Sequence, residues 1–138
     1  MPTFNMKDTS ALKNFLTSPV PKELGTVRCF LKRGQDENGK SIYALYLDRA
    51  KGNKFVMFAR DRGGFLSKGI NVMISMTPQG GRNEPSFVGK VRGNVMRTEF
   101  VVYDSGLAPR KARGRMEVRK ELAFIKYTLS SKHPRQMD

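Results

Sequence analysis

Two pairs of basic residues are the side chains of this sequence best placed to do chemistry. Lys90 and Arg92 are separated by one residue, as are Arg60 and Arg62, and Lys68 follows in a glycine-rich stretch. Side chains two positions apart on a β-strand lie on one face, so each pair presents its charges together. Because arginine and lysine bind phosphate oxygens, two such pairs side by side predict a pocket for a phosphorylated inositol ring. The alternative is that each pair is the solvated face of an amphipathic strand.

A second basic cluster lies in and just after a later segment rich in Gly, Pro, Lys and Arg. It is open to three interpretations: a solvated linker, a polybasic membrane contact worth about 1 kcal/mol per charge, or an arm that follows a nucleic-acid backbone. No aromatic residues interleave with its cations, which argues against stacking of single-stranded bases. The cluster consists of Arg110, Lys111, Arg113, Arg115, Arg119 and Lys120.

The overall charge points to an anionic partner. The sequence has 26 Lys and Arg against 12 Asp and Glu, which gives a formal net charge of +14. A compact domain tolerates such self-repulsion best when it works against a polyanion. Nucleic acid, an anionic membrane leaflet and an acidic protein all satisfy this condition.

Motifs of enzymatic, metal and cofactor sites are missing from the sequence. Cys29 and His133 are the single cysteine and histidine, which excludes an internal disulfide and a zinc site of Cys and His ligands. There is no Walker loop, G-x-G-x-x-G or H-E-x-x-H motif, and the carboxylates are mostly single. We therefore expect no enzymatic activity, no cofactor and no metal.

The hydropathy pattern predicts contact with a membrane surface rather than insertion of a helix. No run of about 18 apolar residues occurs, and residues 1–14 contain no apolar stretch of signal-peptide length. We expect an intracellular protein whose membrane contact comes from its folded surface.

The elements that must position the basic pairs are predicted to be strands, after one short helix. Leu12, Phe15 and Leu16 recur at helical spacing behind the capping residue Thr9 or Ser10, which predicts a helix over 9–16. Period-two or continuous apolar runs, separated by Gly, Asn and Pro, then predict seven strands. Their positions are 25–32, 41–48, 54–60, 70–76, 87–92, 98–104 and 121–129. Seven short strands in one domain indicate an antiparallel sandwich or barrel.

Sulfur-containing residues are expected in the core. Cys29 alternates with Val27 and Leu31, so it is predicted to be a small buried hydrophobe, and the strand over 70–76 reads as buried. Met73, Met76 and Met96 lie among strand residues and are predicted to fill gaps in the core.

Several stretches, in order, resemble the tubby family. Residues 15–29 resemble the opening of its domain, and 43–48 resemble its second strand. Residues 71–75, 80–81 and 87–94 resemble its NYLIS, GG and GKLRSN motifs, and 98–106 resemble TxFTVYDNG. Residues 121–123 and 134–137 also match, so the resemblance extends over nearly the whole chain.

This resemblance implies a closed antiparallel barrel of twelve strands around a central apolar helix, with a basic site for phosphatidylinositol 4,5-bisphosphate. It implies a trafficking adaptor of the plasma membrane and cilium, found in the nucleus in some members. By position, the arginine of GKLRSN falls on Arg92, with Lys90 beside it. The basic GRKR stretch of the family falls on 60–63, where Asp61 and the following glycines depart from the pattern.

The family domain is roughly twice as long as this chain. Residues 1–24 are therefore predicted to be a lead-in with the helix, and 25–138 the first half of a tubby-like β domain. A half-barrel has two open edges and an exposed apolar face, which proteins normally avoid, so we expect completion by further sequence or by a second chain. The predicted function is a membrane-associated adaptor that binds phosphoinositide. The alternative is a non-catalytic structural or nucleic-acid-associated protein within a larger assembly.

Overall fold

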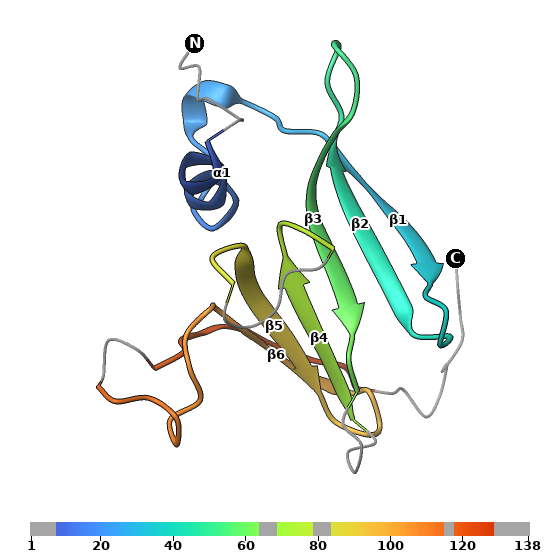
Figure 1. Ribbon diagram of the computed structural model, residues 1–138, viewed down its shortest axis with the longest axis vertical. Coiled ribbons are helices and arrows are strands. Elements are labelled where there is room, and N and C mark those ends of the chain that lie inside the picture. The colour runs from blue at the N-terminus through green and yellow to red at the C-terminus, as the bar shows by residue number, and fades with distance from the viewer. Residues whose placement is uncertain (1–7, 64–68, 79–83, 115–117, 129–138) are drawn as a thin grey trace.

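One antiparallel sheet dominates the computed structural model, which describes residues 8–63, 69–78, 84–114 and 118–128 (Figure 1). A helix, α1 (Thr9–Leu16), and a 3-10 turn, η1 (Lys22–Leu24), precede it. The strands are β1 (Cys29–Gln35), β2 (Ser41–Leu47), β3 (Lys54–Asp61), β4 (Ile70–Ser75), β5 (Phe87–Gly93), β6 (Glu99–Tyr103) and β7 (Glu121–Lys126).

The strands follow one another across the sheet in chain order. Each pairs antiparallel with the next, from β1 to β7, so the described residues form a single meander. Because β1 and β7 lie at opposite ends of this order, the sheet is open rather than closed into a barrel. The prediction of a mainly β, antiparallel half-barrel with a short N-terminal helix is confirmed.

Helix α1 has the predicted bounds, but its cap is Asp8 and not Thr9 or Ser10, because Asp8 is the residue whose side chain reaches the free N–H groups of the first turn. Asp8 is its N-cap, and its carboxylate accepts hydrogen bonds from the backbone N–H groups of Ser10 (3.0 Å) and Ala11 (3.4 Å). Leu12 faces the sheet, while the Lys13 ammonium donates a 2.9 Å hydrogen bond to the carbonyl of Pro85 before β5. Together these contacts hold the helix against one face of the sheet.

The core under α1 is small. Its buried members are Leu12, Leu47, Val56 and Met76, with Leu16, Val27, Leu45 and Val88 packed around them. We call the face of the sheet that carries Leu45 and Leu47 and packs on α1 the inner face. The opposite face is the outer face.

The predicted burial of several residues is wrong at the margins of the sheet. Cys29 is exposed and Leu31 is 55% exposed, because β1 is an edge strand and α1 does not reach it. Met76 is buried as predicted, but Met96 is 77% exposed at a hairpin tip. The strand over 70–76 ends at Ser75 and is mostly half-buried, since only one of its faces is covered.

Strand β7 is exposed along its whole length. All six of its residues are exposed, including Leu122 at 62% and Phe124 at 60%. It has one neighbour, β6, and no other described element packs on it. No helix among the described residues has the length and apolar character needed to cross a membrane.

Replacement of Leu12 tests whether α1 stabilises the sheet. We expect Leu12→Ala to lower the free energy of unfolding by about 2–5 kcal/mol, because it removes a buried side chain from a small core. Ser10→Ala, an exposed change in the same helix, is the matched control. Urea denaturation measures both, and equal effects would show that α1 does not pack on the sheet.

Candidate functional site

The strand register places the predicted basic residues on the outer face. Arg60 on β3 pairs with Met73 on β4, which pairs with Lys90 on β5, which pairs with Tyr103 on β6. Residues paired directly across antiparallel strands share a face. Leu45 of the inner face pairs with Met57, so the alternate positions Phe58 and Arg60 of β3 lie on the opposite face. The Arg60 guanidinium carbon lies 5.5 Å from the centre of the Phe58 ring, and this whole row lies on the outer face.

A second row of paired residues lies on the same face, two positions further along each strand. Arg92 on β5 pairs with Asn71 on β4 and with Val101 on β6. The backbone N–H of Arg62 donates a 2.8 Å hydrogen bond to the carbonyl of Asn71, which extends the β3–β4 pairing and places Arg62 opposite Asn71. Arg62 and Arg92 therefore flank Asn71 on its two sides.

The two basic pairs are not on adjoining strands. Strand β4 lies between β3 and β5, so Arg60 and Lys90 are separated by two strand spacings, or about 10 Å. Met73 and Asn71 of β4 fill the rows between the cations. Lys68 lies outside the described residues.

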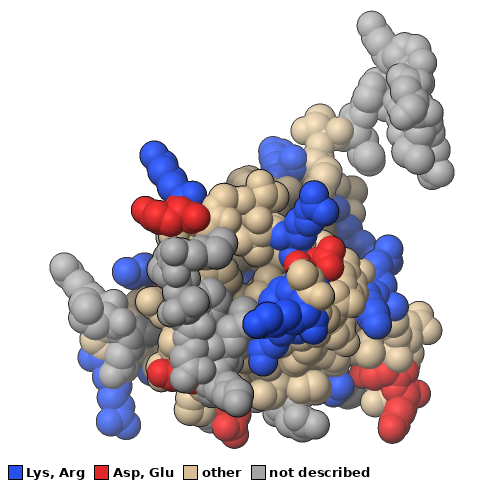
Figure 2. Space-filling view, turned by 90° about the horizontal axis from the view of Figure 1, so that it is seen from above, with Lys and Arg blue, Asp and Glu red and all other residues tan. Residues whose placement is uncertain are grey.

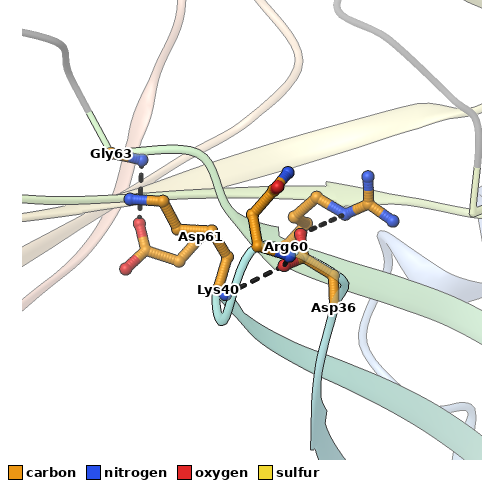
Figure 3. Close-up of polar contacts among 6 residues, drawn as sticks. Asp36, Lys40, Arg60, Asp61 and Gly63 are labelled. Atoms are coloured by element: carbon orange, nitrogen blue, oxygen red, sulfur yellow. Dashed lines mark hydrogen bonds and ion pairs between the residues drawn. The ribbon is translucent and has the colours of Figure 1, made fainter.

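Arg60 faces an internal carboxylate. Its Nε lies 3.9 Å from Oδ2 of Asp36, in the turn between β1 and β2 (Figure 3). That carboxylate is held in place because its Oδ1 accepts 2.9 Å hydrogen bonds from the backbone N–H groups of Asn38 and Lys40. Arg60 thus keeps part of its charge compensated within the chain, unlike Arg92, which lies exposed.

Asp61 anchors the end of β3. Its Oδ1 accepts hydrogen bonds from the backbone N–H groups of Gly63 (3.0 Å) and Asn71 (3.3 Å), as Figure 3 shows for Gly63. Gly63 has a φ of 51°, in the left-handed region that glycine adopts without strain. The residues that depart from the GRKR pattern therefore build the exit from β3.

Lys90 is the most buried cation that the structure describes on this face. It is 4% exposed, between Met73 and Tyr103 in its row, and its ammonium lies 5.9 Å from the centre of the Tyr103 ring. Burial of a lysine in this way requires interacting partners and restricts its side chain. A truncation of Lys90 would remove packing as well as charge, which makes Arg92 the cleaner residue to test.

Arg119, a member of the second basic cluster, contacts this face of the sheet. Its guanidinium carbon lies 3.9 Å from the centre of the Tyr103 ring, the same ring that Lys90 approaches. The backbone beneath is tied down, because Oδ1 of Asp104 accepts 2.9 Å hydrogen bonds from the N–H groups of Gly106 and Lys120. A Cβ on Gly106 would meet the backbone of Arg119, so this close approach requires glycine.

Three buried polar atoms on this face lack a hydrogen-bond partner among the described residues. They are Oδ1 of Asn71, Nη1 of Arg119 and Nε of Arg60. Buried polar groups of folded proteins are nearly always satisfied, so such atoms mark a place for a polar ligand. We call Asn71, Lys90, Arg92 and Arg119 the outer-face site, with Arg60 at its margin.

Sequence reasoning did not name Asn71 as a site residue, and it assigned Arg119 to the second basic cluster and not to the basic pairs. Asn71 is a polar residue followed by the apolar run Val72–Ile74, which is a signal that the sequence does contain. Arg119 gave no such signal, because its ring contact depends on how the long segment between β6 and β7 returns to the sheet.

The other members of the basic cluster lie on the surface of the β6–β7 connection. Arg110, Lys111, Arg113 and Lys120 are exposed, and Arg115 lies outside the described residues. Basic side chains are spread over the face seen in Figure 2, with acidic side chains beside several of them. Within the described ranges no three His, Cys, Asp or Glu side chains are grouped as a metal ion would require.

The sequence matches the Tub family over residues 16–138. It is 40% identical over 141 residues to human "Tubby-related protein 3", covering 94% of this chain and 31% of that protein. It is 34% identical to human "Tubby-related protein 1", covering 91% and 24%, and 36% identical to "Protein king tubby 2" of Aedes aegypti, covering 91% and 31%. The chain therefore spans less than a third of the length of these relatives.

Replacement of Gly106 tests how Arg119 is positioned. We expect Gly106→Ala to push Arg119 off the Tyr103 ring, because the added methyl group meets the Arg119 backbone. The upfield ring-current shift of the Arg119 side-chain protons, measured by NMR, would then be lost. Gly114→Ala is the control, since nothing lies within 4 Å of its Cβ position. An unchanged Arg119 shift in Gly106→Ala would contradict this positioning.

Proposed function

Because this chain belongs to the Tub family, we propose that it is a non-catalytic adaptor that binds phosphatidylinositol 4,5-bisphosphate at a membrane surface. The observation that carries the proposal is the strand register, which gathers Lys90, Arg92 and Asn71 on one face beside Arg119. A phosphorylated inositol ring combines phosphates with hydroxyl groups. The outer-face site offers groups suited to both.

The cations of the site suit the phosphates. Arg92 is exposed and its guanidinium can take two oxygens of one phosphate. Arg119 is held over Tyr103, and its buried Nη1 has a hydrogen free for an acceptor. Lys90 adds charge between them. A fixed set of donors binds a rigid polyphosphate with less loss of side-chain entropy than flexible surface lysines would.

Asn71 suits the hydroxyl groups. Its Oδ1 is buried and without a hydrogen-bond partner among the described residues, so a ring hydroxyl that donates to it would satisfy an otherwise costly acceptor. Arg62 and Arg60 lie on the β3 side and add long-range attraction. The formal charge of +14 favours any anionic leaflet and raises the rate of encounter with it.

The cellular role follows from family membership. We propose a peripheral protein of the plasma membrane or cilium that serves in trafficking, and the nucleus is a further site. The open edges of the sheet, β1 and β7, support completion of the barrel by further strands, from a second chain or from additional sequence.

Vesicle binding tests the headgroup site. We expect the chain to prefer vesicles containing phosphatidylinositol 4,5-bisphosphate over vesicles of equal charge made with phosphatidylserine. Arg92→Ala should weaken this binding roughly tenfold, because it removes a charged hydrogen-bond donor. Lys51→Ala, which removes an exposed charge from the β2–β3 turn, is the matched control. Flotation assays measure all three proteins.

Two outcomes would count against the headgroup site. Equal binding to both vesicles would refute a specific pocket and leave only general attraction to negative charge. Tight binding to duplex DNA or RNA that survives Arg92→Ala, but is lost when the exposed cations of the β6–β7 connection are neutralised, would favour the nucleic-acid alternative.

Asp36 should restrain Arg60. We expect Asp36→Asn to raise the affinity for soluble inositol 1,4,5-trisphosphate about two- to fivefold, because Arg60 loses its internal counter-charge while the turn keeps its hydrogen-bond acceptor. Glu37→Gln removes the same charge one residue away and is the control. Isothermal titration calorimetry measures both variants. An equal gain from both would mean that only net charge matters.

A further inference from the structure

The hairpin between β5 and β6 ends in an apolar tip. Val95 is 61% exposed and Met96 is 77% exposed, so two neighbouring large hydrophobic side chains lie in solvent. Single exposed hydrophobic residues are common, but an adjacent pair at a projecting tip is a mark of an interaction surface. Tyr127, 60% exposed, lies beside this hairpin, because its backbone N–H donates a 2.7 Å hydrogen bond to the carbonyl of Thr98.

The tip is held in a fixed shape. Oδ1 of Asn94 accepts hydrogen bonds from the backbone N–H groups of Thr98 (2.9 Å) and Glu99 (3.2 Å), and its Nδ2 donates to the Thr98 hydroxyl (2.9 Å). Arg97 adopts a φ of 58°, which closes the turn, and its N–H donates to the Asn94 carbonyl (3.1 Å). The turn therefore keeps Val95 and Met96 pointing outward without help from a partner.

The tip lies on the same strand as the outer-face site. Arg92 precedes Val95 by three residues, so the tip projects at most about 10 Å beyond the Arg92 row. Two cations lie near it: Arg97 follows Met96 in the turn, and Lys126, at the end of the neighbouring strand β7, lies 3.8 Å from the carboxylate of Glu99. The last residues of β3 and β5 lie at the same end of the sheet (Figure 1), which is also the end where Arg62 leaves β3.

We propose that Val95 and Met96 insert into the boundary between headgroups and acyl chains when the outer-face site holds a lipid headgroup. This inference rests on the proposed function and adds to it a second, apolar contact with the bilayer. An apolar tip with cations nearby suits an anionic bilayer surface, into which such elements sink by about 5–10 Å. In membrane proteins tyrosine is enriched at the interface between the membrane and water, which fits the position of Tyr127 beside the hairpin.

The depth of the tip explains why headgroup binding would favour insertion of Val95 and Met96, and why insertion would favour headgroup binding. A headgroup bound at the level of Lys90 and Arg92 places the end of the strand about 10 Å closer to the acyl chains, which is on the order of the depth of the headgroup layer. Sheet and tip then contact the lipid at two points, so the orientation of β5 is defined with its β5–β6 turn toward the membrane. A soluble headgroup would engage the first point alone.

The test compares a soluble headgroup with a bilayer, using the whole chain. The double variant Val95→Ser with Met96→Ser is titrated with soluble inositol 1,4,5-trisphosphate and with phosphatidylcholine vesicles containing phosphatidylinositol 4,5-bisphosphate. We expect unchanged affinity for the soluble probe and a loss of about tenfold for vesicles, because burial of two apolar side chains no longer contributes. Val20→Ser, an equally apolar and 50% exposed site near η1, is the matched control and should change neither.

Each result decides the matter. Full vesicle affinity in the double variant, with soluble binding intact, would overturn the insertion and leave the headgroup site standing. If the unmodified chain did not bind soluble inositol 1,4,5-trisphosphate, both the insertion and the headgroup site would be overturned. A second readout does not depend on truncation: the fluorescence of Met96→Trp should shift to the blue and be quenched by brominated acyl chains on these vesicles. Absence of quenching would reject the bilayer and assign the tip to a protein contact.

Discussion

The antiparallel register from β3 to β6 is the constraint on which the outer-face site depends. Arg60, Met73, Lys90 and Tyr103 form one continuous row across four strands, and Asn71 with Arg92 forms the next. Because side chains alternate between faces, a slip of one residue in any pair would turn cations toward α1. The apolar inner face opposes such a slip, so the same pattern that builds the core also positions the charges.

The acidic side chains near the site serve the backbone more than the cations. Asp61 and Asp104 each accept two backbone hydrogen bonds where the chain leaves β3 and β6, and Asp36 does so in the β1–β2 turn. Only Asp36 also approaches a cation of this face, Arg60. Carboxylates used in this way order the loops around the site while leaving Arg92 and Arg119 available for an external anion.

The inner face of the sheet is only partly covered, whereas the residues of the outer-face site come from β4, β5 and the segment that precedes β7. Val56 is the one fully buried large side chain among the described residues, and β7 is exposed throughout. The chain spans less than a third of the length of its relatives, and the completion proposed above would add strands beside the open edges β1 and β7. Those strands would not cross the rows that hold Lys90 and Arg92. The proposed headgroup binding and the proposed completion of the barrel therefore concern different parts of the sheet.

The sequence by itself determined the helix, the seven strands and the face shared by each basic pair, because hydrophobic periodicity and turn residues are local signals. It also identified the family, through motifs kept in order. Only the tertiary structure decided that β4 separates Arg60 from Lys90, that Arg119 lies over Tyr103, and that Cys29 and Met96 are exposed. Those facts depend on which strand is an edge and where a long loop returns, and both are set by contacts between residues distant in the chain.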